Sequence, residues 1–215
     1  AATCTFPARP GTPRWNDVRK GMKEMRLERD LLAFRPFNEQ EACDREEMLR
    51  IVRTCPNCFF RENLQAHFCA SAWIVDEKRE QTLMAYHRIY DAWAWTGGHA
   101  DGETDLLAVA LREAQEETGV PARPLRRDIF SLEILTVDGH EKRGRYVPSH
   151  LHLNVTYLLE ASREAPLYSK PDENLSVRWF PLEEALRACS ERWMVQRVYS
   201  KLNAKLAAWQ EENQR

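Results

Sequence analysis

The stretch that decides the fold is Trp93–Val120, WAWTGGHADGETDLLAVALREAQEETGV. It joins a glycine pair and a turn to one amphipathic helix. Its apolar positions recur at three- and four-residue steps, at Leu107, Ala110, Leu111, Ala114 and Thr118. That period predicts a helix with one buried stripe. We expect Thr104 to cap its N-terminus, Asp105 to lie in the first turn, and Gly119 to end the helix.

A second face of the same helix gathers Glu113, Glu116 and Glu117, because residues three and four apart are helical neighbours. Adjacent like charges oppose folding, and a hard divalent cation would reverse that effect. Arg112 lies one turn before Glu116 and is placed to orient it. The face therefore indicates a metal site suited to phosphoryl chemistry, and the alternative is a solvated acidic surface.

At this point the residues resemble the Nudix box, a 23-residue pattern that runs here from Gly98 to Val120. The pattern is a glycine, five residues, a glutamate, seven residues, and then R-E-U-x-E-E-x-G-U, with U an aliphatic residue. The segment Arg112–Val120 matches its second half at every fixed position. Two positions depart from the family, because Thr104 replaces the first box glutamate and Thr96 replaces a frequent proline.

The resemblance to Nudix hydrolases implies an α/β fold, an α/β/α sandwich with a mixed β-sheet. It also implies a hydrolase that acts on nucleoside diphosphates linked to another group. In the family, the glutamates at Glu113, Glu116 and Glu117 hold Mg²⁺ or Mn²⁺, together with the backbone carbonyl of the residue at Gly97. Glu103 stands one position before the missing glutamate, so it is a weaker candidate that requires a reshaped turn.

Composition sets broader bounds on the partners. The 215 residues carry 31 Lys and Arg against 33 Asp and Glu, which gives a net charge of -2 and no basic field for a nucleic acid polymer. No apolar run approaches the length of a membrane span, so no membrane partner is expected. We predict a cytoplasmic protein whose six cysteines are mostly reduced.

The chain divides into three predicted parts. Residues 1–24 are proline-rich and without periodicity, which indicates a flexible leader. Residues 25–64 form a helical extension in which Asn38 and Glu41 make a capping-box-like pair before a helix that reaches about Val52. Residues 65–215 form the Nudix-like domain, which opens with a hairpin made of HFCASAWIVD and QTLMAYH.

Basic and histidine residues after the box are candidate substrate contacts. A long strand over 147–159 places His150 and His152 on one face, where they would meet phosphate if that face looked toward the acidic helix. The alternative is hydrogen-bonded sheet histidines. Arg145 lies in the basic loop HEKRGR and is placed to meet an anionic substrate, or is simply solvated.

The pair Cys55 and Cys58, with His67 and Cys69, offers four soft ligands and a possible zinc site. The last two lie about 7 Å apart on one face of a strand, and no second C-x-x-C follows. Ordinary thiols are therefore favoured over a zinc knuckle.

Glu173 stands six residues before Trp179, where the resembled family often has a glutamate that completes the metal shell or acts as base. We take Glu173 as the candidate general base, with Glu116 and Glu117 as rivals and a surface acid as the alternative. The final segment, 191–210, carries an apolar helical stripe. It is expected to dock on its own domain, and a homodimer contact stays open.

The sequence thus predicts a metal-dependent hydrolase of a phosphoanhydride bond in a small-molecule diphosphate. A non-catalytic Nudix-fold module that senses a ligand or binds a protein is the main alternative. An isomerase of isoprenoid diphosphates is less favoured, because Thr96-Gly97-Gly98-His99 stands where that enzyme's cysteine motif is expected. The substrate itself is not predicted.

Overall fold

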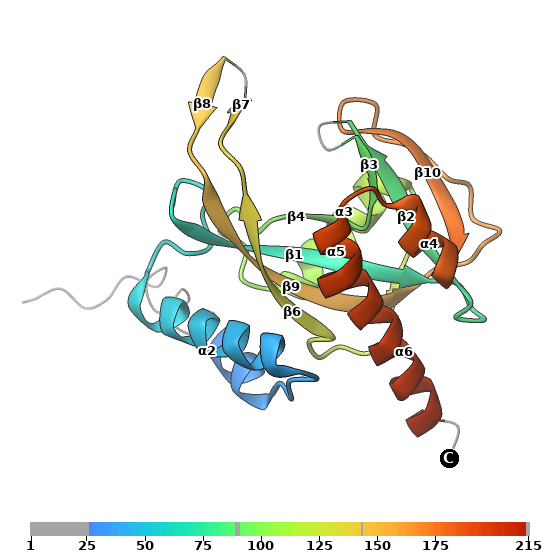
Figure 1. Ribbon diagram of the computed structural model, residues 1–215, viewed down its shortest axis with the longest axis horizontal. Coiled ribbons are helices and arrows are strands. Elements are labelled where there is room, and N and C mark those ends of the chain that lie inside the picture. The colour runs from blue at the N-terminus through green and yellow to red at the C-terminus, as the bar shows by residue number, and fades with distance from the viewer. Residues whose placement is uncertain (1–25, 89–90, 143, 214–215) are drawn as a thin grey trace, which may run out of the picture.

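The computed structural model describes residues 26–88, 91–142 and 144–213 (Figure 1). The proposed leader at 1–24 lies outside them, and the division of the chain into three parts stays a prediction. In these described ranges residues 26–33 are helical, and the later helical segments are α2 Glu39–Thr54, α3 Leu106–Thr118, α4 Leu182–Ala188, α5 Arg192–Met194, a π-helical turn at Val195–Tyr199, and α6 Ser200–Asn213.

Eight strands form one mixed sheet, with the path β10-β2-β1-β9-β5. Strand β3 pairs with β2, β4 with β1, and β6 with β9. The bounds are β1 Ala66–Val75, β2 Gln81–His87, β3 Ala92–Ala94, β4 Thr96–His99, β5 Arg123–Pro124, β6 Ser131–Val137, β9 His150–Glu160 and β10 Asn174–Pro181. Strands β1 and β9 are parallel along ten residue pairs, so the predicted β1–β2 hairpin is built onto a parallel centre.

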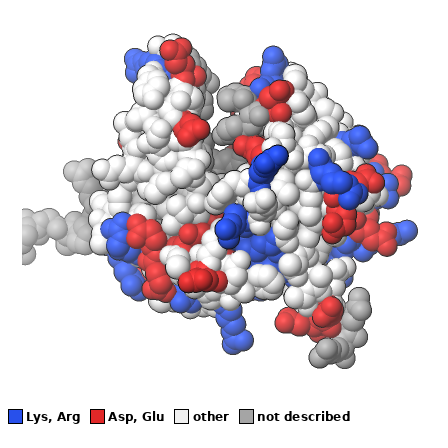
Figure 2. All heavy atoms as spheres, in the orientation of Figure 1, with Lys and Arg blue, Asp and Glu red and all other residues white. Residues whose placement is uncertain are grey.

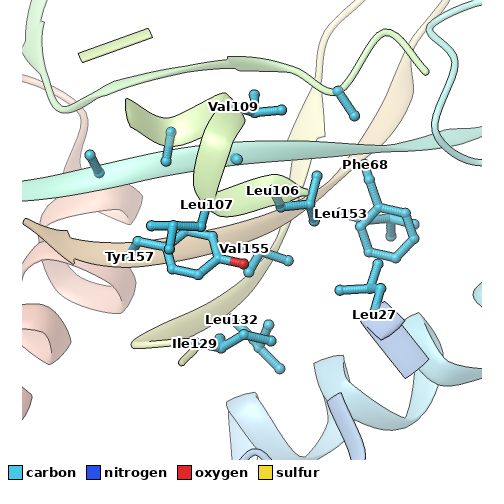
Figure 3. Packing of buried hydrophobic residues seen from close by; sticks show 14 of the residues in the cluster. Leu27, Phe68, Leu106, Leu107, Val109, Ile129, Leu132, Leu153, Val155 and Tyr157 are labelled. Atoms are coloured by element: carbon cyan, nitrogen blue, oxygen red, sulfur yellow. The ribbon is translucent and has the colours of Figure 1, made fainter. Parts of the chain in front are cut away.

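Alternation along β1 divides the core between the two faces of the sheet. Phe68 and Ala70 pack with the apolar stripe of α3, and Figure 3 shows Leu106 and Leu153 beside Phe68. On the other face Trp73 packs with Tyr199 and α6, which crosses the front of the sheet in Figure 1. Every residue of β1 is therefore buried. The predicted α/β/α sandwich is confirmed.

The box helix ends as expected and begins one residue later than expected. Asp105, rather than Thr104, is the N-cap, because its side chain accepts a hydrogen bond from the Ala108 N–H at 3.3 Å. The carboxylate of Glu103 accepts from the N–H groups of Thr104 and Asp105 at 2.7 and 2.9 Å, so it serves the helix start. Gly119 ends the helix with φ 75°, a left-handed conformation that glycine adopts without strain.

The N-terminal helix α2 is tied to the sheet and to α6 through Glu41. Asn38 caps α2 by accepting from the Glu41 N–H at 3.0 Å, as the capping pair predicts. The buried carboxylate of Glu41 in turn accepts from Lys205 at 2.7 Å and from the Ser131 hydroxyl at 2.7 Å. Burial opposes its ionisation, but Lys205 and Lys201 outweigh burial and lower the pKa of Glu41. These contacts fix the helical extension against the core.

The predicted basic loop is a second, small sheet. Strands β7 His140–Lys142 and β8 Arg145–Val147 pair antiparallel and project from the body of the molecule in Figure 1. The C-terminal stripe, which includes Val198, Leu202 and Leu206, is buried on its own sheet. A homodimer contact stays a prediction. Within the described ranges, no helix combines the length and the apolar composition that a bilayer crossing requires.

Candidate active site

Glu117 is the most deeply placed carboxylate of the acidic helix face. Its side chain accepts hydrogen bonds from the Gly97 N–H at 2.8 Å and from the Asn174 amide at 3.0 Å. Burial raises the pKa of Glu117 from 4.5 to about 7, despite these two hydrogen bonds. The last turn of α3 is thereby held against the glycine pair of β4 and the first residue of β10.

Glu113 lies one turn earlier and packs directly on Gly98. A β-carbon added at Gly98 would stand 2.5 Å from the carboxylate carbon of Glu113, so glycine is needed for this approach. Burial raises the pKa of Glu113, and Arg112 opposes that rise by donating to its carboxylate at 2.9 Å. Arg112 therefore orients Glu113 more closely than Glu116, whose nearest oxygen lies 3.8 Å from the Arg112 Nε.

Glu116 is the open member of the trio, with 45 % of its side chain exposed. Lys170 connects it to the loop before β10, because its ammonium lies 3.5 Å from Glu116 and 3.1 Å from Glu173. The candidate base Glu173 is thus brought beside the acidic helix face although it is 56 residues away from Glu117 in the chain. Its role stays a prediction.

Lys170 and Asn174 are site residues that the sequence reading did not single out. Asn174 directly follows Glu173 in the chain. Lys170 lies three residues before Glu173, in the same turn, and its carbonyl accepts a hydrogen bond from the Glu173 N–H at 3.0 Å. The Oδ1 atom of Asn174 is buried next to the Glu117 carboxylate and has no hydrogen-bond partner within the described part of the chain. A polar residue flanking a candidate base was the available signal.

His150 and His152 face away from α3. Leu153 of β9 points into the core beside Leu106 (Figure 3). Because side chains alternate along a strand, His150 and His152 lie on the opposite face of the sheet. Burial, with the nearby His99, His67 and His150, lowers the pKa of His152 to about 2. Contact of His150 or His152 with substrate stays a prediction. A substrate bound at the acidic face of α3 would lie on the other side of the sheet from both histidines.

Arg145 is exposed on β8, in the projecting hairpin. Its contact with substrate stays a prediction.

The thiol of Cys55 contacts the side chains of Asn57 and Asn63 at 3.2 and 3.0 Å. Among the described residues, the potential ligand atoms that gather within 4.8 Å are those of His67, Cys69, His99 and His152. That set includes neither Cys55 nor Cys58. Among the same described residues, the glutamates of α3 lie outside that set.

The chain is similar to known proteins in both sequence and fold. Residues 66–201 match the NUDIX domain, and they span the sheet, the box helix and the Glu173 loop. The chain belongs to the Nudix family. The matched residues include the box segment Gly98–Val120 and the loop before β10.

One curated relative of this Nudix protein is a CMP-5'-(N-acetyl-N-hydroxy-3-aminopropyl)phosphonate hydrolase of Streptomyces rubellomurinus. It is 32% identical over 132 residues, which cover 58% of each chain. The chain thus spans less than two thirds of the length of the relative that it matches.

Two solved structures are also similar. The Ap4A hydrolase of C. elegans has 19% sequence identity and a TM-score of 0.47, and covers 67% of this chain and 98% of its own. The dihydroneopterin triphosphate pyrophosphohydrolase of E. coli has 16% identity and a TM-score of 0.46, and covers 62% and 92% respectively.

Proposed function

We propose that this Nudix protein hydrolyses a phosphoanhydride bond of a nucleoside-diphosphate-linked or related small molecule, with Mg²⁺ or Mn²⁺. The observation that carries the proposal is the buried Glu117 carboxylate, which is held by Gly97 and Asn174 and stands one turn from Glu113. A solvated acidic surface has no reason to bury one acid and pack a second on a glycine.

The residues present fit a hard divalent cation. Glu113, Glu116 and Glu117 would hold it with oxygen ligands, and the Gly97 carbonyl is the fourth proposed ligand. When bound, the ion neutralises phosphate oxygens and lowers the pKa of water. The raised pKa values of Glu113 and Glu117 support this assignment, because a carboxylate that is costly to ionise alone gains most from a cation beside it.

Arg112 and Lys170 position the proposed metal ligands and the proposed base. Arg112 donates to Glu113 and so fixes one ligand. Glu173 is the proposed general base, which removes a proton from the attacking water, and Glu116 and Glu117 are its rivals. Lys170 bridges Glu173 and Glu116, which keeps the proposed base within reach of the acidic face.

The proposed substrate is a small molecule rather than a nucleic acid polymer. Acidic and basic side chains are interspersed over the face shown in Figure 2, and the chain has a net charge of -2. The relative from Streptomyces rubellomurinus is named for a CMP-linked phosphonate. Cytidine nucleotides whose 5'-phosphate is joined to a second phosphoryl or phosphonyl group are therefore the first substrates to test. The proposal sets the reaction in the cytoplasm.

The test is a substrate panel assayed with Mg²⁺ and with Mn²⁺. It includes CMP-linked phosphonates, nucleotide sugars, dinucleoside polyphosphates, dinucleotide cofactors and oxidised nucleotides. We expect metal-dependent release of a nucleoside monophosphate or of phosphate from at least one class. Binding of a panel member without turnover would instead indicate a sensing module. Rearrangement of an isoprenoid diphosphate without phosphate release would indicate an isomerase.

A further inference from the structure

Four residues with nitrogen and sulfur ligands form a compact block on the sheet face opposite α3. Strand β1 contributes His67 and Cys69, which alternate onto the same face. In the sheet register His99 of β4 stands opposite Cys69, and His152 of β9 stands opposite His67. The potential ligand atoms of all four lie within 4.8 Å of one another.

Hydrogen bonds assign the ring protons of His67 and His152, and each ring keeps one nitrogen with a free lone pair. His67 is 2 % exposed, and its Nδ1 lies 2.9 Å from the Asn63 carbonyl, so that nitrogen carries the proton. The other ring nitrogen, Nε2, is buried and has no hydrogen-bond partner among the described residues. A buried acceptor without a partner costs free energy unless something binds it.

His150 fixes the state of His152 in the same way. The Nδ1 of His150 lies 2.8 Å from the Pro148 carbonyl, so it is the donor, and Nε2 of His150 is left as an acceptor. The Nε2 of His152 lies 3.2 Å from that acceptor and therefore carries its own proton. The remaining nitrogen of His152, Nδ1, keeps its lone pair.

We propose that His67, Cys69, His99 and His152 bind one Zn²⁺ ion. Borderline-soft zinc takes imidazole nitrogen and thiolate sulfur, whereas Mg²⁺ takes oxygen, so this site is chemically distinct from the glutamate site on α3. The backbone acceptor on His67 Nδ1 and the His150 ring on His152 Nε2 are the outer-shell contacts that metal-binding histidines make.

Binding requires a small closure and one proton release. Tetrahedral zinc with bonds of about 2.0 to 2.3 Å separates its ligand atoms by roughly 3.3 to 3.7 Å. The four side chains therefore move together by about 1 Å from the present limit of 4.8 Å. The Cys69 S–H proton passes to solvent as the zinc–sulfur bond forms. His99 and His152 are only partly buried and offer the ion a route in.

A closed set of four protein ligands is typical of structural rather than catalytic zinc. The ion would link β4, β1 and β9 through their side chains. Its ligand from β4 is His99, which directly follows the glycine pair in the chain. It would hold β4 in register and so hold Gly97 and Gly98 against the carboxylates of Glu117 and Glu113.

The test begins with the untagged full chain, purified, stripped with a chelator and then given Zn²⁺ alone. We expect one zinc ion per chain by elemental analysis and a raised melting temperature. The His67→Ala variant should retain less than about a tenth of the bound zinc, while His140→Ala, altered in the projecting hairpin, keeps it. Wild-type protein with no bound zinc and an unchanged melting temperature overturns the proposal.

A cobalt spectrum identifies the sulfur ligand without relying on stability. Co²⁺ added to the stripped chain should give tetrahedral visible bands and a thiolate-to-cobalt charge-transfer band. The charge-transfer band should disappear in Cys69→Ser and persist in Cys189→Ser, a matched buried cysteine elsewhere in the core. Its persistence in Cys69→Ser contradicts the assignment. Neither measurement uses a substrate, so each result is independent of the proposed hydrolysis.

Discussion

The acidic face of α3 and the histidine–cysteine block of β1, β4 and β9 lie on opposite faces of one sheet and differ in every chemical respect. On the acidic face, exposure to solvent increases from the buried Glu117 to Glu116, whose side chain is 45 % exposed, and the potential ligand atoms are all oxygens. The histidine–cysteine block offers nitrogen and sulfur in a set already gathered within 4.8 Å. An open oxygen site suits an ion shared with substrate, and a closed nitrogen–sulfur site suits a permanent one.

The two regions meet at the segment Thr96–His99. Gly97 and Gly98 contact the glutamates, and the next residue, His99, belongs to the block. A single short strand thus serves both proposed metal sites, the first through its backbone and the second through the side chain of His99. The following changes should separate the two environments.

The largest effect is expected from Glu116→Gln. It removes a proposed ligand charge from an exposed side chain, so turnover of the best panel substrate should fall by about 100-fold or more while the melting temperature barely changes. Bound zinc should stay at the wild-type level. The matched control is Glu183→Gln in the first turn of α4, which should keep full turnover. Undiminished turnover in Glu116→Gln removes it from the metal site.

The next effect is a pH dependence of stability that belongs to Glu117. In metal-free protein the folded chain keeps the Glu117 proton up to about pH 7, whereas the unfolded chain releases it near pH 4.5. The free energy of unfolding should therefore fall as the pH rises through this window, by on the order of 3 kcal/mol from this group. Glu117→Gln should abolish that share of the fall.

Urea unfolding of chelator-treated protein at pH 5 and pH 8 measures this difference. Glu117→Gln preserves the shape of the side chain. The Asn174 side chain can rotate so that its oxygen accepts a hydrogen bond from the new glutamine amide. Groups that do not interact with Glu117 contribute equally in both proteins and cancel in the comparison, whereas Glu113 is coupled to Glu117 because its charge also raises the pKa of Glu117. An equal pH dependence in both proteins would show that Glu117 is ionised at little cost.

The two glycines should respond differently to alanine. A β-carbon at Gly98 meets the movable carboxylate of Glu113, so Gly98→Ala should cost activity by roughly 10- to 100-fold with little loss of stability. A β-carbon at Gly97 would stand 2.7 Å from the Ala70 carbonyl oxygen in β1, so Gly97→Ala should cost about 1–3 kcal/mol of stability. Thermal unfolding and turnover, measured on both variants, test this division.

The smallest effect is expected from Cys55→Ser. A serine hydroxyl can accept from the Asn63 amide as the thiol does, so the change in stability should stay below about 1 kcal/mol. Bound zinc should not change, because Cys55 lies outside the block. Loss of zinc in Cys55→Ser would restore the zinc knuckle that the sequence suggested.

The acidic face could be predicted from the sequence because one helix fixes the spacing of its residues. The period of Leu107, Ala110 and Ala114 gave the buried stripe, and the same period placed the glutamates. The fold followed from the same stretch through its resemblance to the Nudix box. The start of the helix was off by one, since the choice between Thr104 and Asp105 as cap depends on where the Glu103 carboxylate turns.

The histidine–cysteine block could not be predicted in the same way. His67 and Cys69 are 30 or more residues from His99 and 83 or more from His152, and only the register of β4 and β9 on β1 joins them. The sequence offered Cys55 and Cys58 instead, because they were near. Lys170 could not be predicted for a related reason, because its contact with Glu116 depends on how the loop before β10 folds back.

Hydrolysis in ¹⁸O-labelled water tests the central assignment most directly. Mass analysis of the products from the best panel substrate, with Mg²⁺ present, should find one labelled oxygen on a phosphorus-containing product. The label should be absent with excess chelator and strongly reduced in Glu116→Gln. Label incorporation at an undiminished rate in chelator and in Glu116→Gln would contradict a metal-dependent attack of water on phosphorus at the acidic face of α3.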